Sequence, residues 1–103
     1  MAYQIIADKA FRADYKNVKR RYPEVIAEFK SAVAELAVTG TVPDSYNPHP
    51  LNNVGGNYNG HYDFHLSDGK VDVVVLYLPH KTNPSIRLVR IGTHSDLFQG
   101  PMR

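Results

Sequence analysis

The chain has 103 residues, 43% of them hydrophobic, which supports one core and excludes two, so we expect a single domain over residues 1–103. It contains no cysteine, which excludes disulfides, zinc–thiolate sites and thiol nucleophiles. The formal net charge of +2 is too small to prove a nucleic-acid partner, and neither a signal-peptide pattern nor a membrane-length apolar run is found, so we expect a cytoplasmic protein.

The first part of the chain predicts a short strand followed by two helices. Residues 3–7 are short, apolar and β-prone, and Asp8 suits the N-cap of a helix that follows them. Apolar residues of this helix recur every three or four positions and predict one core-facing side. Pro23 suits the first turn of a second helix, and Gly40 suits its C-cap. Two helices joined this tightly predict an α-hairpin.

The basic residues of the first predicted helix recur on a different face from its apolar residues. Their spacings of three, four and three residues place them along one side of the helix. A charged helix face of this kind is most often simply solvated. This basic face consists of Lys9, Arg12, Lys16 and Lys19.

A long connection is predicted over residues 41–59, which are rich in proline, glycine and asparagine and have no pattern of their own. Loops of this length inside a compact domain are more often functional than idle. His49 lies in this connection and is therefore a candidate functional residue.

Three further strands are predicted. Residues 61–66 alternate strictly, as a half-buried strand does. Their apolar face consists of Tyr62, Phe64 and Leu66. Their polar face consists of His61, Asp63 and His65. Judged alone, this polar face is most simply a solvated strand face, but together with His94 and Arg90 a functional role is favoured.

The last two strands complete an antiparallel meander. Residues 71–78 are almost wholly apolar, as in a central strand covered on both faces, with Asp72 near their start. Residues 85–92 form the final strand, whose alternation puts Val89 and Ile91 on one face and Leu88 and Arg90 on the other. We therefore expect an α+β fold, a four-stranded sheet with both helices packed on one face.

Imidazoles, a guanidinium and carboxylates recur in the second half of the chain. Imidazole titrates near neutral pH and both takes and gives protons, while arginine stays charged and forks onto phosphate oxygens. Such a set of groups is sufficient to break a phosphodiester without a metal. RNA cleavage is therefore the leading hypothesis from the residues.

A family resemblance joins these groups. It extends over nearly the whole chain and is carried by His49-Pro50-Leu51, Asp63-Phe64-His65 and Arg90-Ile91-Gly92-Thr93-His94-Ser95-Asp96-Leu97-Phe98. In these motifs the chain resembles the YafQ branch of the RelE toxin superfamily. The resemblance implies an endoribonuclease toxin of a type II toxin–antitoxin system. Such a toxin cuts mRNA in the ribosomal A site and is held inactive by a cognate antitoxin protein.

The resemblance also implies the site and its chemistry. The active-site positions that it carries over are His49, His65, Asp72, Arg90, His94 and Phe98. His94 is expected to be the general acid and Arg90 the phosphate stabiliser, with no metal or cofactor required. Asp72 or His65 is expected to be the base, His49 to support from the loop, and Phe98 to stack on a base or only to tuck the C-terminus onto the core. The basic face is expected to contact ribosomal RNA.

Three departures from the family pattern affect these assignments, one of which is Tyr62 in place of a basic residue just before Asp63. Val73 stands where the family has a tryptophan, which removes a stacking contact. The hairpin that contains Asp68 is longer than usual, so Asp68 is an alternative to Asp72.

Two rival functions fit the same sequence. His61, Asp63 and His65, with His94 nearby, are a ligand set that suits zinc, which would indicate a metal-dependent hydrolase. A degenerate toxin that only binds RNA or protein would also carry these motifs.

Overall fold

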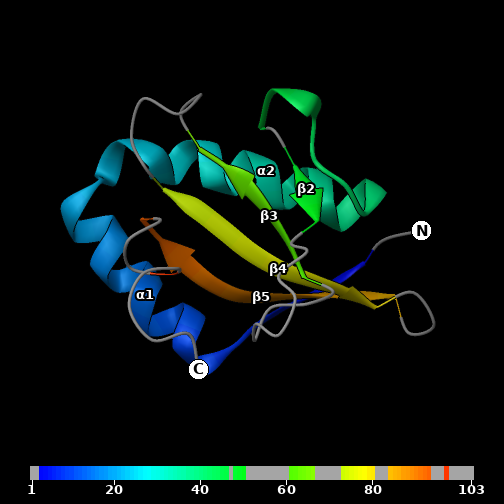
Figure 1. Cartoon of the computed structure of the whole chain (residues 1–103), viewed down its shortest axis with the longest axis horizontal. Coiled ribbons are helices and arrows are strands. Elements are labelled where there is room, and N and C mark those ends of the chain that lie inside the picture. Colours follow the sequence, from blue (N-terminus) through cyan, green and yellow to red (C-terminus); the bar gives the residue numbers. More distant parts are fainter. Residues whose placement is uncertain are drawn as a thin grey trace.

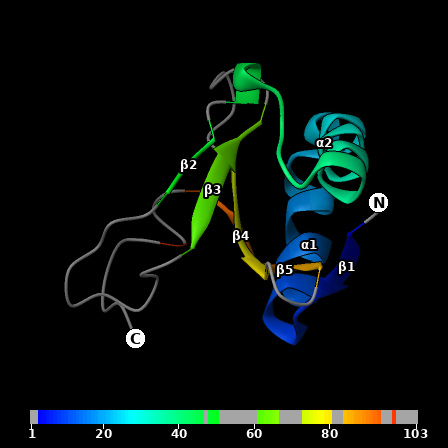
Figure 2. The same cartoon turned by 90° about the vertical axis from the view of Figure 1, so that its right-hand side faces the viewer.

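A sheet with helices on one side forms the fold (Figure 1, Figure 2). The computed structural model describes residues 3–46, 48–50, 61–66, 73–80, 84–93 and 97, and of His49 and His80 it describes the backbone alone. The helices are α1 (Lys9–Arg21) and α2 (Ile26–Thr39), with the short 3₁₀ helices η1 (Pro23–Val25) and η2 (Asp44–Tyr46). The strands are β1 (Gln4–Ala7), β2 (His49–Pro50), β3 (Tyr62–His65), β4 (Val74–His80) and β5 (Ser85–Gly92).

The strands are ordered β1-β5-β4-β3-β2 across the sheet. β1 runs parallel to β5, and the other neighbouring strands are antiparallel. The four longer strands correspond to the predicted N-terminal strand and meander, which confirms the predicted α+β class. β2 adds two residues at the sheet edge, and with η2 it lies in the connection that was predicted to have no pattern of its own.

Local sequence explains the helical hairpin. Pro23 begins η1, and α2 follows directly, so the proline starts the turn between the helices rather than α2 itself. Gly40 ends α2 in the left-handed conformation, at φ 81°, and its N–H donates to the Leu36 carbonyl at 2.9 Å. Glycine adopts this conformation without steric cost, as predicted for this C-cap. No helix in the described part of the chain is both long and apolar enough to cross a membrane.

Asp8 occupies the N-cap position of α1, as predicted, but its side chain does not cap the helix. The carboxylate instead accepts two hydrogen bonds from Arg87 of β5, at 3.0 Å from Nε and 2.7 Å from Nη2. A bidentate, charge-assisted pair of this kind is stronger than a bond to a single helix N–H. The hydrogen bond and the charge of Asp8 raise the pKa of the Arg87 guanidinium above its ordinary value.

The main core lies between the helices and the sheet face that they cover. On the helical side, the Phe29 ring lies 5.7 Å from the Phe11 ring and 5.4 Å from the Tyr15 ring. The sheet contributes the buried side chains of Phe64, Leu66, Val73, Val75, Tyr77, Ile86, Leu88 and Ile91. Burial of each large apolar side chain contributes about 1.5–3 kcal/mol, so this layer holds the helices on the sheet.

A smaller cluster covers the opposite face of the sheet. Val74 and Leu76 of β4 pack there against Leu97, with Val89 of β5 at the margin. The N–H of Leu97 donates to the Thr93 carbonyl at 3.1 Å. β4 therefore has apolar contacts on both of its faces, as its continuous apolar sequence predicts.

The predicted faces of β5 are wrong near its C-terminal end. Leu88 and Ile91 both belong to the helix-side core, while Val89 belongs to the cluster on the opposite face. The cause is a shift in register, because Tyr77 pairs with Leu88 whereas Leu76 pairs with Arg90. One extra residue in β5 interrupts the alternation at this bulge, and a bulge re-aims the side chains that follow it.

Candidate active site

The sheet register aligns several of the predicted site residues. His49 pairs with Asp63, Asp63 pairs with Leu76, and Leu76 pairs with Arg90. Cross-strand partners share one face of a sheet, and Leu76 belongs to the cluster on the face away from the helices. Four neighbouring strands thus bring these positions into one row on that face. His65 begins the adjacent row, which continues through Val74 to Gly92.

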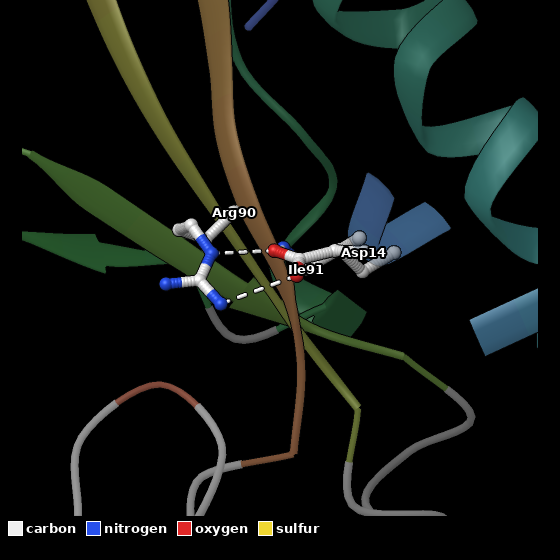
Figure 3. A network of polar contacts seen from close by, with 3 residues as sticks. All are labelled: Asp14, Arg90 and Ile91. Atoms are coloured by element: carbon white, nitrogen blue, oxygen red, sulfur yellow. Dashed lines mark hydrogen bonds and ion pairs between the residues drawn. The ribbon is translucent and has the colours of Figure 1, made fainter. Parts of the chain in front are cut away.

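Arg90 is held by a carboxylate that the sequence did not identify. Its Nε donates to Asp14 Oδ2 at 2.5 Å and its Nη2 donates to Asp14 Oδ1 at 3.1 Å (Figure 3). Asp14 lies on α1, and the side chains of Arg90 and Asp14 are 30% and 19% exposed. The contact is bidentate and therefore fixes the plane of the guanidinium as well as its position.

Asp14 also closes an open edge of β5. β1 pairs with β5 only from Ser85 to Leu88, so the edge of β5 beyond Leu88 has no neighbouring strand among the described residues. The backbone N–H of Ile91 on this edge donates to Asp14 Oδ2 at 3.2 Å. One carboxylate therefore anchors both the backbone and the arginine side chain at the end of this strand.

Asp63 is buried, with 2% of its surface exposed, so the interpretation of this strand face as solvated is wrong. Its position in the row, between His49 and Leu76, encloses it within the sheet rather than at an edge. Burial above all, then the neighbouring Tyr62 and the charge of Asp63, raise the pKa of the Tyr77 phenol to about 12. Because Asp63 is buried, a lower dielectric than that of water surrounds it, and its charge acts more strongly on neighbouring groups.

A polar cavity of about 260 Å³ opens beside Arg90, between α1 and β5. Its lining includes Asp14, Asn17, Arg21, Tyr22, Arg90 and Gly92. The Arg21 guanidinium lies 5.2 Å from the centre of the Tyr22 ring and donates to the Tyr22 hydroxyl at 3.2 Å. Arg90 therefore stands at the junction of this cavity and the row across the sheet.

Among the described residues, no three His, Asp or Glu side chains form a group that would hold a metal ion. The metal hypothesis had placed its ligands at His61, Asp63 and His65, with His94 nearby. Asp63 is buried while both histidines are half-buried. His94 lies outside the described residues, so the full proposed ligand set is not seen.

The predicted site residues fall into two groups. Arg90 and His65 are described with their side chains, and His49 with its backbone alone. Asp72, its alternative Asp68, His94 and Phe98 lie outside the described residues. All four residues of the basic face are exposed on α1, which fits an interaction surface as well as a solvated face.

The structure shows roles for Val73 and Asp14 that the sequence motifs did not predict. Val73 is 1% exposed in the helix-side core, so this position supports packing. Asp14 is an acidic residue in an otherwise basic helix, and no sequence motif includes it. Nothing local to Asp14 indicated Arg90, which is 76 residues further along the chain.

Known proteins resemble this chain in sequence and in fold. Residues 3–99 match the family model described as the bacterial toxin YafQ of type II toxin–antitoxin systems. A comparison with curated proteins finds no match. A crystal structure of YafQ from E. coli aligns with a TM-score of 0.68 at 22% identity, over 93% of this chain and 98% of that chain.

Two other solved structures align over similar lengths. The E. coli DinJ–YafQ toxin–antitoxin complex gives 24% identity and a TM-score of 0.68, over 95% of this chain and 99% of that chain. A metal-bound toxin from Helicobacter pylori gives 26% identity and a TM-score of 0.67, over 93% and 99%. With the family model covering almost the whole sequence, the chain belongs to the YafQ family of bacterial toxins from type II toxin–antitoxin systems.

Proposed function

We propose that this toxin is an endoribonuclease that cuts mRNA in the ribosomal A site. The observation that carries the proposal is the row across one sheet face, in a chain of the YafQ family, that aligns Arg90 with Asp63 and His49. The Arg90 guanidinium is held in a fixed plane by Asp14, and a fixed guanidinium is suited to binding a phosphate and stabilising charge on it.

The proposed reaction is an internal transfer at phosphorus. The ribose 2′-oxygen attacks the adjacent phosphate, a base takes the 2′ proton, and the bond to the 5′-oxygen breaks. An acid gives a proton to that leaving oxygen, so the products are a 2′,3′-cyclic phosphate and a 5′-hydroxyl. Arg90 stabilises the charge on the phosphoryl oxygens, and no metal is required for any of these steps.

The remaining roles follow the family resemblance. His94 is the proposed general acid, and His65 or Asp72 is the proposed base, with Asp68 as the alternative to Asp72. His49 supports the site from β2, and Phe98 stacks on a base. The basic face of α1, which is Lys9, Arg12, Lys16 and Lys19, contacts ribosomal RNA through its charge.

We further propose that residues 1–103 act as one toxin domain in the cytoplasm, where the ribosomes are. A cognate antitoxin holds the toxin inactive until it is removed. The DinJ–YafQ toxin–antitoxin complex supports this proposal, because a chain of similar fold is found there with its antitoxin.

The deciding experiment compares purified ribosome-bound message with the same RNA free in solution. We expect efficient cleavage only on the ribosome, because a small site relies on the ribosome to position the RNA, and positioning supplies a large part of the barrier. Mapped 5′ ends should carry hydroxyl groups. Equal digestion of free RNA would overturn ribosome dependence, and no cleavage of either RNA would favour a binding module.

The metal-dependent alternative is tested in the same assay. The Helicobacter pylori toxin of similar fold is metal-bound, which makes this test worthwhile. We expect cleavage to persist after dialysis against a chelator. Activity that is lost on chelation and restored by zinc would support the metal-dependent hydrolase instead.

A further inference from the structure

The contact between Asp14 and Arg90 links the first helix to the proposed site. Asp14 comes from the middle of α1, and its two oxygens meet two nitrogens on one edge of the guanidinium. In Figure 3 the third nitrogen, Nη1, points away from Asp14. The carboxylate therefore sets which edge of the guanidinium faces α1 and which edge is turned away from it.

Asp14 is well suited to setting this orientation because it is fixed itself. Its backbone is part of a regular helix, and its Oδ2 also accepts the N–H of Ile91. The side chain thus bridges α1, the backbone of β5 and the arginine. A long, flexible arginine side chain loses much of its rotational freedom in such a bidentate contact.

The contact between Asp14 and Arg90 is one of several that join α1 to β5, beside the Asp8–Arg87 pair and the main core. Its two side chains are partly exposed, and ion pairs that water reaches are weak contributors to stability. The main core between the helices and the sheet does not depend on it. A large effect of Asp14 on activity with a small effect on stability would therefore indicate a role in orientation.

The fold contains a matched pair for comparison. Asp8 at the start of α1 binds Arg87 of β5 through Nε and Nη2, in the same bidentate manner. Arg87 pairs with Ile6 and Leu78, outside the row that contains His49, Asp63 and Arg90. Breaking the Asp8–Arg87 pair removes an equivalent link between α1 and β5 without touching Arg90.

We propose that Asp14 is a positioning residue that orients the Arg90 guanidinium toward the phosphate of the RNA. The proposal rests on the proposed function, because it assigns a cause to the geometry of the proposed phosphate stabiliser. Asp14 does not touch the substrate; it acts through Arg90.

The test compares Asp14→Asn with Asp8→Asn on ribosome-bound message under single-turnover conditions. Asparagine has the size of aspartate but lacks the charge and the second acceptor oxygen, so the guanidinium loses its bidentate partner. We expect Asp14→Asn to lower the maximal cleavage rate about tenfold or more, since a misplacement of about 1 Å costs up to roughly a hundredfold, while half-saturation by ribosomes changes little. Asp14→Glu, which restores a carboxylate, should recover part of the rate. Asp8→Asn should stay within about twofold of the parent.

NMR spectroscopy tests the orientation of the Arg90 guanidinium independently of cleavage. The Nε–H proton of Arg90 should exchange slowly with solvent in the parent and in Asp8→Asn, and rapidly in Asp14→Asn. An unchanged cleavage rate in Asp14→Asn, or an equal loss in Asp8→Asn, would overturn the positioning role. A faster rate in Asp14→Asn would also overturn it and would indicate that Asp14 restrains Arg90.

The two proposals fail separately. A parent protein that cuts no ribosome-bound message would refute the proposed function. In that case the exchange rate of the Arg90 Nε–H still decides whether Asp14 orients Arg90, and equal exchange in the parent and in Asp14→Asn would refute the inference.

Discussion

The ring of Tyr77 stacks on the ring of Tyr62, with the centroids 5.8 Å apart and the planes at 28°. The two residues are cross-strand partners in β3 and β4, and Tyr77 has only 4% of its surface exposed. Burial, the neighbouring phenol and Asp63 all favour the protonated form of Tyr77, so its pKa lies at about 12 instead of 10.0.

This shift predicts a loss of stability in alkali. Below pH 10 Tyr77 is protonated in both the folded and the unfolded chain, and its contribution is fully present. Between pH 10 and 12 the unfolded chain loses this proton while the folded chain keeps it, so stability falls as pH rises, by on the order of 2 kcal/mol. Urea unfolding of the parent and of Tyr77→Phe at several pH values measures this. Tyr77→Phe should lose less stability than the parent between pH 10 and 12. Equal losses would contradict the raised pKa of Tyr77.

His94→Ala tests the proposed general acid. Removal of a positioned proton donor should lower the cleavage of ribosome-bound message by roughly a hundredfold or more. His80→Ala is the control, since His80 belongs to no proposed catalytic group and its loss should be nearly silent. If the His94 variant is folded and cuts at the parental rate, the acid must be sought at His49, His65 or outside this chain.

Arg90→Lys separates charge from geometry. Lysine keeps the positive charge but cannot form two parallel hydrogen bonds with the phosphate. The variant should therefore keep only a small part of the parental activity. Arg87→Lys makes the same change in the matched pair with Asp8 and should keep nearly full activity. Single-turnover cleavage measures both variants, and full activity in Arg90→Lys would show that the bidentate geometry is dispensable.

Charge reversal on the basic face tests the contact with ribosomal RNA. Replacing Lys9 and Lys16 by Glu should weaken binding to ribosomes roughly tenfold or more and reduce its dependence on salt, because fewer phosphate contacts form. Lys30→Glu on α2 is the control for a reversal at an exposed lysine elsewhere. Cosedimentation at several salt concentrations measures the binding of each variant to ribosomes. Unchanged binding of the double variant would identify this face as merely solvated.

Gly40→Ala tests the end of α2. A methyl group there would stand 2.7 Å from Cζ of Tyr3, and φ is +81°, so we expect a loss of about 2 kcal/mol and a fall in Tm on the order of 10 °C. Tyr3→Leu/Gly40→Ala relieves the steric contact but not the backbone strain, and should recover part of the loss. Equal melting temperatures for the parent and Gly40→Ala would contradict both causes.

Local periodicity predicted the helices and strands because their side chains repeat at the spacing of the element. The same reasoning failed at Val89, because a bulge depends on how β5 meets β4, and no single strand encodes that pairing. It failed also for the environment of Asp63. Alternation places this residue on a face, but burial is set by the strands and apolar residues that cover that face.

Sequence motifs identified Arg90 and His65 as candidate site residues, but they did not indicate which contacts fix these side chains. Asp14 meets Arg90 only after α1 has packed beside the end of β5, so the contact is a product of the tertiary fold. Long-range ion pairs leave no spacing in the sequence by which they can be found.

The bond from the Ile91 N–H to Asp14 has a consequence for solubility. A strand edge with open backbone groups is a template on which a second chain can add a strand, and proteins resist this by placing charges at such edges. On the part of this edge beyond β1 that the structure describes, Asp14 occupies the N–H of Ile91, a donor that an incoming strand could use. An incoming chain would have to displace this carboxylate, already paired with Arg90, before it could extend the sheet.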